Sequence, residues 1–131
     1  MREDWVEDDA ALSTEEYSAI PNVMTFTHPH ERNDWIALAT ARIVARRLRE
    51  NPALVEKGRE RILASRERGR DFSAYREWEE IIRKLPVAAI AELLEAQTEE
   101  GQRLRSSRPF IGPPFILDEE RRAILESAFA E

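Results

Sequence analysis

The chain has 131 residues, a formal net charge of -6 at pH 7 and no cysteine. A chain of this length fits one domain, which buries about two thirds of the surface that the unfolded chain exposes. The missing cysteines exclude disulfides, thiolate zinc sites and a cysteine nucleophile, and are compatible with a reducing cytoplasm. Because residues 1–9 are too acidic for a signal peptide and no apolar run has the length of a membrane span, we expect a cytoplasmic protein that contacts no membrane.

The charge is distributed unevenly along the chain. Residues 1–34 carry nine acids and two bases, whereas residues 42–70 carry ten bases and four acids. A basic segment inside an acidic chain can bind an anionic partner or the acidic part of its own chain. All but two of the 20 bases are arginine. Arginine suits bidentate binding of phosphates and carboxylates, although a high genomic GC content explains the same bias.

Helical spacing of apolar residues dominates the chain after residue 34, and the alternation typical of strands is nearly absent. The sequence therefore predicts an all-α fold, a single compact bundle of five or six helices with short corners and a proline-rich loop before the last helix. Residues 13–131 would form this helical domain. Residues 1–12 are too polar to fold alone, and we expect them to be a flexible acidic arm.

Capping residues divide the first part of the domain. Ser13 and Glu16 have the spacing of a capping box, which predicts a short helix that ends near Ile20. Residues 22–28 show no period and are expected to form a loop. A second helix is predicted over residues 29–50, with Arg42, Arg46 and Arg49 largely outward.

Two further helices follow in the middle of the chain. Asn51 before a proline predicts a sharp corner and the N-cap of a third helix over residues 52–68, which Gly69 would end as a left-handed C-cap. Ser73 is the predicted N-cap of the fourth helix. Its apolar stripe has the clearest helical spacing in the chain and comprises Tyr75, Trp78, Ile82 and Leu85.

The last third of the chain contains two predicted helices and two loops. Pro86 separates the fourth helix from a fifth over residues 87–97, because proline lacks a backbone donor and disfavours helix at the preceding residue. Residues 98–106 are expected to form a brief turn. Asp118 is the predicted N-cap of the last helix, with acids in its first turn.

The sequence carries no pattern typical of catalysis. His30 and Asp34 have the spacing of a two-ligand metal site, but no third ligand is evident, so we expect the surface of a helix start and no metal. The glutamates of residues 77–100 mostly lie opposite the apolar stripes, and a solvated helix face explains their positions. There is no phosphate-binding glycine loop, nucleophile elbow or His-Glu-x-x-His motif. We therefore predict no enzyme, no catalytic residue and no cofactor.

The basic segment offers one candidate for nucleic-acid binding. The two helices around Asn51 loosely resemble a helix-turn-helix, and a basic helix face can follow phosphates. Four glutamates interrupt this face, and no helix rich in base-reading side chains stands out. A DNA-binding regulator would use the basic face of residues 42–70 through Arg42, Arg46, Arg49, Arg59 and Arg66.

Two apolar features are candidates for binding a protein. Trp5 lies among the acids of residues 1–12, as an aromatic anchor that could order on a basic cleft in a partner or on this protein's own arginines. Residues 109–117 carry large apolar side chains on a backbone stiffened by three prolines, which lowers the entropy lost on binding. Two alternatives stay open: residues 1–12 could be a frayed terminus, and the loop could close the protein's own core.

Two stretches resemble a group of small bacterial proteins that are uncharacterised or antitoxin-like. Residues 42–54 are similar to that group's helix of the form A-R-x-L-x-x-x-P-x-L. Residues 104–112, with Glu120, Arg121, Ile124 and Leu125 behind them, are similar to a motif of the form L-R-x-S-x-P-F-x-G followed by E-R-x-x-I-L. The chain departs from the pattern by the insertion of residues 113–115 and by its acidic first residues. The resemblance implies a component of a toxin-antitoxin or mobile-element module and transfers no catalytic residue.

We therefore expect a non-catalytic binding protein, in the form of an antitoxin that neutralises a toxin encoded by a neighbouring gene. The residues expected to contact the partner are Trp5, Pro109, Phe110, Ile111 and Phe115. The DNA-binding regulator is the alternative, and DNA as a further partner and a homo-oligomer both stay open.

Overall fold

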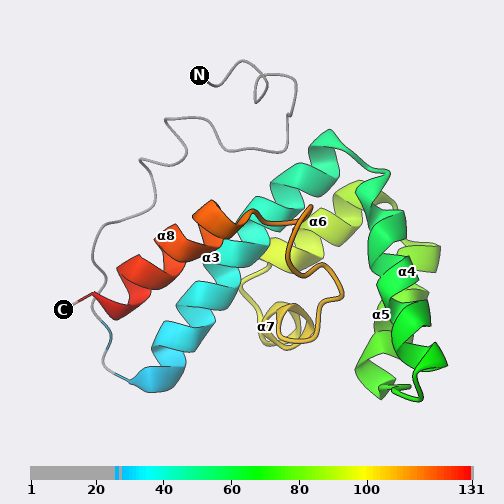
Figure 1. Ribbon diagram of the computed structural model, residues 1–131, viewed down its shortest axis with the longest axis horizontal. Coiled ribbons are helices and arrows are strands. Elements are labelled where there is room, and N and C mark those ends of the chain that lie inside the picture. Colours follow the sequence, from blue (N-terminus) through cyan, green and yellow to red (C-terminus); the bar gives the residue numbers. More distant parts are fainter. Residues whose placement is uncertain (1–25, 27, 131) are drawn as a thin grey trace.

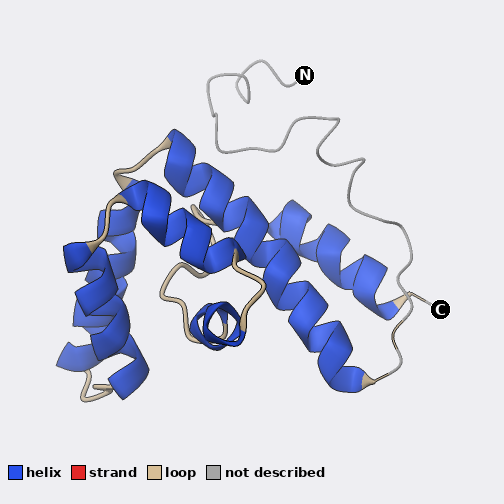
Figure 2. Ribbon diagram, turned by 180° about the vertical axis from the view of Figure 1, so that it is seen from behind, coloured by secondary structure: helices blue, strands red, loops and turns tan. Residues whose placement is uncertain are grey.

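The computed structural model describes residue 26 and residues 28–130. The helices of this part are α3 (Pro29–Glu50), α4 (Leu54–Glu67), α5 (Ser73–Lys84), α6 (Val87–Glu95), α7 (Glu99–Arg105) and α8 (Asp118–Phe129). The described residues contain no strand, as Figure 2 shows, which confirms the predicted all-α class. No described helix is both long and apolar enough to cross a bilayer. The short helix predicted after Ser13 lies outside the described residues.

The helices are arranged around α3, the longest of them. Helices α6 and α8 pack along α3, and α7 contacts both α3 and α6. Helices α4 and α5 form a hairpin at one end of the molecule, to the right in Figure 1. This hairpin stands apart from α8, which lies at the other side of α3. The hairpin therefore presents faces that no other described helix covers.

The contact of α3 with α6 forms the centre of the core. On α3, side chains at the i, i+3, i+4, i+7 spacing are fully buried, and they meet fully buried side chains of α6; the two sets are Ala41, Val44, Ala45 and Leu48, and Ile90, Ala91 and Leu94. Alanines on both helices permit a close approach of the two backbones. Each large aliphatic side chain buried here stabilises the fold by about 1.5–3 kcal/mol.

The turn between α4 and α5 has the geometry of a Schellman motif, which the sequence predicted through Gly69. This glycine has a φ of 80°, in the left-handed region that favours glycine. The Arg70 amide donates to the Ser65 carbonyl at 2.9 Å, and the Gly69 amide donates to the Arg66 carbonyl at 2.9 Å. The predicted helix end is thus confirmed.

Other predicted boundaries were wrong in their details. The turn expected over residues 98–106 is helix α7, which Thr98 caps by accepting a hydrogen bond from the Gly101 amide at 3.0 Å. The N-caps of α5 and α8 are Phe72 and Leu117, one residue before the polar residues predicted for that position. Asn51 closes α3 through its amide and does not cap α4, whose N-cap is Ala53. The backbone and side-chain hydrogen bonds at each helix end, and not the polar side chain alone, determine where the helix begins or stops.

The loop between α7 and α8 closes the core with aromatic side chains. Phe110 and Phe115 are 0% and 1% exposed. The centroids of their rings lie 5.3 Å apart. The centroid of the Phe110 ring lies 5.6 Å from that of the buried Trp78, in an edge-to-face arrangement. Phe110 also packs on Gly58 of α4, where a Cβ atom would lie 2.3 Å from the ring. The loop thus joins the hairpin to the rest of the core.

A fully buried ion pair joins α3 to α8. The guanidinium of Arg47 contacts the carboxylate of Glu120, and both side chains are completely buried. Arg47 also donates to the Phe115 carbonyl at 3.0 Å, and Glu120 accepts from the Leu117 amide at 2.9 Å. Because these backbone contacts satisfy further lone pairs and protons, they offset part of the desolvation cost of the two charges. The sequence analysis gave Glu120 as an acid of the first turn of the last helix and did not predict its pair with Arg47.

Candidate partner-binding groove

The loop residues predicted to contact a partner lie mostly inside the molecule. Pro109, Phe110 and Phe115 are buried, while Ile111 is 48% exposed. Trp5 lies outside the described residues. Of the two alternatives for this loop, the structure favours closure of the protein's own core. Ile111 alone among the described members of the set has an exposed side chain.

The arginines of the DNA-binding alternative are mostly ion-paired with this chain's own carboxylates. Arg49 and Glu95 lie 2.7 Å apart, which raises the pKa of Arg49, chiefly through their hydrogen bond. The other pairs are Arg46 with Glu50 at 3.3 Å, Arg59 with Glu56 at 2.9 Å, and Arg66 with Glu79 at 2.7 Å and with Asp71 at 3.4 Å. Arg42 is exposed on α3. Paired guanidiniums present little net charge to DNA phosphates, so this set makes a weak phosphate-binding surface.

Other bases of residues 42–70 gather around an open groove between α4 and α5. Within the described part of the chain, Lys57, Arg61, Arg68 and Arg70 form no ion pair. The groove has a volume of about 710 Å³ and is lined by these four bases together with Glu60, Ala64, Ser65, Phe72 and Tyr75. Four bases against one acid give the lining a formal charge of +3. The excess positive charge of residues 42–70 is therefore concentrated here.

The helical repeat of α4 places most of this lining on one face. Positions 57, 61, 64 and 68 follow each other at three or four residues, so their side chains lie above one another along the helix. The small side chains of Ala64 and Ser65 leave space between the longer ones. The Schellman turn then reverses the chain and brings Arg70 and Phe72 to the same groove.

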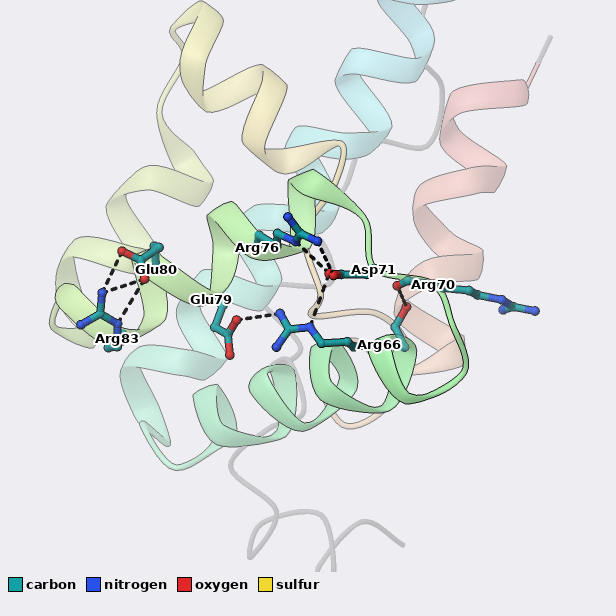
Figure 3. Close-up of polar contacts among 8 residues, drawn as sticks. Arg66, Arg70, Asp71, Arg76, Glu79, Glu80 and Arg83 are labelled. Carbon is teal, nitrogen blue, oxygen red and sulfur yellow. Dashed lines mark hydrogen bonds and ion pairs between the residues drawn. The ribbon is translucent and has the colours of Figure 1, made fainter.

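An ion-pair network on the hairpin fixes the turn beside the groove. Asp71 accepts from Arg76 at 3.0 Å and from Arg66 at 3.4 Å, and Arg66 also donates to Glu79 at 2.7 Å (Figure 3). The hydrogen bond from Arg76 is the main cause that lowers the pKa of Asp71, with Arg66 contributing. Figure 3 shows the side chain of Arg70 extending away from this network. Asp71 and Glu79 are thus engaged by Arg66 and Arg76, and Arg70 forms no ion pair within the described part of the chain.

Two aromatic rings complete the groove. Phe72 is 54% exposed, which is unusual for a side chain of this size. Its ring meets that of Tyr75 edge-to-face at a centroid distance of 5.9 Å. Arginine guanidiniums bind carboxylates in bidentate fashion, and exposed aromatic rings contribute contact area at low entropic cost. The groove can therefore hold an acidic segment that also carries an apolar or aromatic side chain.

A second hollow lies on the outer face of α8, between residues 118 and 130. Its charged lining is balanced, with Arg121 and Arg122 against Asp118 and Glu126. Its exposed aromatic residue, Phe129, is covered on one side by the guanidinium of Arg32 at 4.7 Å. Because the lining of this hollow has no net formal charge, it is a weaker candidate than the α4–α5 groove.

The described residues offer no arrangement typical of catalysis. No three of their histidine, aspartate or glutamate side chains are grouped so that they could hold a metal ion. His28 and His30 stack on each other at 5.5 Å at the exposed start of α3. On the hairpin, hydrogen bonds from Arg76 and Arg103 lower the pKa values of Asp71 and Glu77, which makes these two carboxyl groups poor proton donors at neutral pH.

Comparison of the chain with protein-family models, with curated proteins and with solved structures gave no match. The groove was not among the sites expected from the sequence. Its signal was present in the spacing of Lys57, Arg61 and Arg68 on one helix face, followed by Phe72 and Tyr75. The sequence did not show which bases would be paired, because several partners lie far along the chain.

Proposed function

We propose that this protein is a non-catalytic binding protein that holds an acidic segment of a protein partner in the groove between α4 and α5. One observation supports this most strongly. Bases on neighbouring positions are paired with carboxylates, whereas Lys57, Arg61, Arg68 and Arg70 form no ion pair with another described residue and lie around two aromatic rings. A groove that keeps positive charge and an exposed phenylalanine is complementary to an acidic, partly apolar ligand.

The composition of the groove favours a protein over DNA. Glu60 lies among the bases and would repel a continuous row of phosphates. Phe72, more than half exposed, is the kind of aromatic anchor that contributes most to protein interfaces. The arginines first considered for DNA binding are mostly neutralised by their own ion pairs.

The form of this function that we propose is an antitoxin in a bacterial toxin-antitoxin system. The motif resemblance of residues 42–54 and 104–112 supports it. The groove, in place of the buried Phe110 and Phe115, would contact the toxin. Neutralisation would follow from occupation of the toxin's acidic surface near its active cleft.

Co-expression with the product of the neighbouring gene tests the proposal. We expect the wild-type protein to relieve growth arrest caused by that product and to be retained with it in a pull-down. Arg61→Glu should abolish both effects, because it reverses a charge inside the groove. Arg59→Glu is the matched control, since it changes the net charge equally on the same helix but at a residue paired with Glu56.

Three results would contradict the proposal. One is equal activity of the Arg61→Glu and Arg59→Glu variants. Another is tight, salt-dependent binding of duplex DNA that Arg61→Glu removes, which would make phosphates the ligand. The third is the absence of any complex with the neighbouring product and of any effect on growth.

A further inference from the structure

The acidic residues 1–12 have the chemistry that the α4–α5 groove is built to hold. They lie outside the part of the chain that the structure describes. Five acids, Glu3, Asp4, Glu7, Asp8 and Asp9, surround Trp5 and Val6. An aromatic side chain flanked by carboxylates matches a groove in which four bases surround Phe72 and Tyr75.

We propose that residues 1–12 of this chain occupy the α4–α5 groove and compete there with the partner. Carboxylates at residues 3–9 would pair with Lys57, Arg61, Arg68 and Arg70 of the groove, which have no ion pair with other described residues. Trp5 would cover the exposed ring of Phe72. The proposal rests on the proposed function of the groove and adds a means of regulating it.

The length of the chain permits this docking within one molecule. Sixteen residues, 13–28, separate the acidic segment from the start of α3, and an extended chain of that length spans up to roughly 55 Å. Helix α3 has 22 residues, which corresponds to about 33 Å. Residues 1–12 can therefore reach along α3 towards the hairpin that follows it.

Competition of this kind would set a threshold for partner binding. A segment attached to the same chain acts at a high effective concentration. An external ligand therefore needs a higher affinity for the groove than it would need against the same segment free in solution. A partner with a better acidic and apolar match would displace it. Loss of the segment's charge would leave the groove open.

Photo-crosslinking from position 5 tests the docking directly in the full chain. Trp5 is replaced by p-benzoylphenylalanine, which keeps an aromatic ring at this position, and the crosslinked peptides are identified by mass spectrometry. We expect crosslinks to residues 57–75, reduced at least fivefold by Arg61→Glu with Arg68→Glu and by 0.5 M NaCl. Arg59→Glu should leave their yield unchanged. The mass of the product distinguishes docking within one molecule from docking between two copies.

Crosslinks that map only outside residues 57–75, or a yield indifferent to both Arg61→Glu with Arg68→Glu and salt, would overturn the inference. A second measurement separates it from the proposed function. Neutralisation of the five acids to their amides should strengthen partner binding at least threefold, because the competing segment loses its charge. If partner binding depends on Arg61 but is unchanged by this neutralisation, the groove is the partner site and the competition is wrong.

Discussion

The aromatic side chains of the loop before α8 are buried, whereas Phe72 and Tyr75 of the α4–α5 hairpin are exposed and half-buried, respectively. Phe110 and Phe115 of the loop are fully buried against Trp78, whereas Phe72 of the hairpin is 54% exposed. The loop contributes to folding, and the hairpin leaves apolar and cationic groups available to a ligand. This difference in exposure shows that large apolar side chains on a stiff backbone form a binding surface only when no neighbouring element covers them.

The largest change in stability is expected for a substitution in the loop before α8. Phe110→Ala should lower the free energy of unfolding by about 3–5 kcal/mol, because it removes a buried ring and leaves a cavity beside Trp78 and Gly58. Urea denaturation measures the change. Ile111→Ala, at an exposed neighbour, is the control and should change stability by less than about 0.5 kcal/mol. Similar values for the two variants would show that the loop does not belong to the core.

An effect of similar size is expected at the buried ion pair. Glu120→Ala should cost about 3–5 kcal/mol, because the Arg47 guanidinium would stay buried without its carboxylate. Thermal and urea unfolding measure the loss. The double variant Arg47→Met with Glu120→Leu should recover much of it, since both buried charges are then removed. A double variant less stable than Glu120→Ala would argue that the pair is itself a strong net stabiliser.

A smaller effect is expected where the loop meets the hairpin. Gly58→Ala should destabilise the fold by about 1–3 kcal/mol, because the added Cβ would lie 2.3 Å from the Phe110 ring and force it to shift. Differential scanning calorimetry gives the change in Tm. In the Phe110→Ala background the same substitution should cost little, as the ring is gone. Additive losses in the double variant would contradict a contact between the two residues.

The smallest effect concerns the pH dependence of the hairpin. The pKa of Asp71 is held below its ordinary value of 3.8, first by the hydrogen bond from Arg76, so its charge stabilises the fold above that pH. This contribution is lost as the pH falls below about 3.8 through the lowered pKa of the folded state. Hydrogen exchange of the turn amides should therefore accelerate at low pH. Asp71→Asn should remove this pH dependence, and an unchanged profile in the variant would assign it to other acids.

Local signals in the sequence were sufficient for most of the helices. Pro86 separates α5 from α6 and Gly69 ends α4, since each acts through its own backbone. Helix α7 was missed because its seven residues are too few for a clear apolar period and contain a glycine. That glycine is required by the close approach of the Ala96 carbonyl, a contact that no local pattern reveals.

The α4–α5 groove could not be predicted in the same way, because it depends on which basic side chains form ion pairs. Arg49 pairs with Glu95 and Arg103 with Glu77, and in both pairs the residues lie on different helices far apart in sequence. Arg59 has Glu56 three residues before it on the same helix, so its ion pair can be expected from the spacing. Only the fold shows that Arg61 faces a groove together with Phe72 and Tyr75.

The Kd of the neighbouring gene product for two phenylalanine variants shows whether the groove of the hairpin is the binding surface. Phe72 and Phe129 are 54% and 57% exposed, so Phe72→Ala and Phe129→Ala remove equally exposed rings from different faces. We predict that Phe72→Ala weakens binding at least about tenfold, roughly 1.4 kcal/mol, with an unchanged Tm, and that Phe129→Ala leaves the Kd unchanged. A Kd insensitive to Phe72→Ala, or equally sensitive to both variants, would contradict the claim.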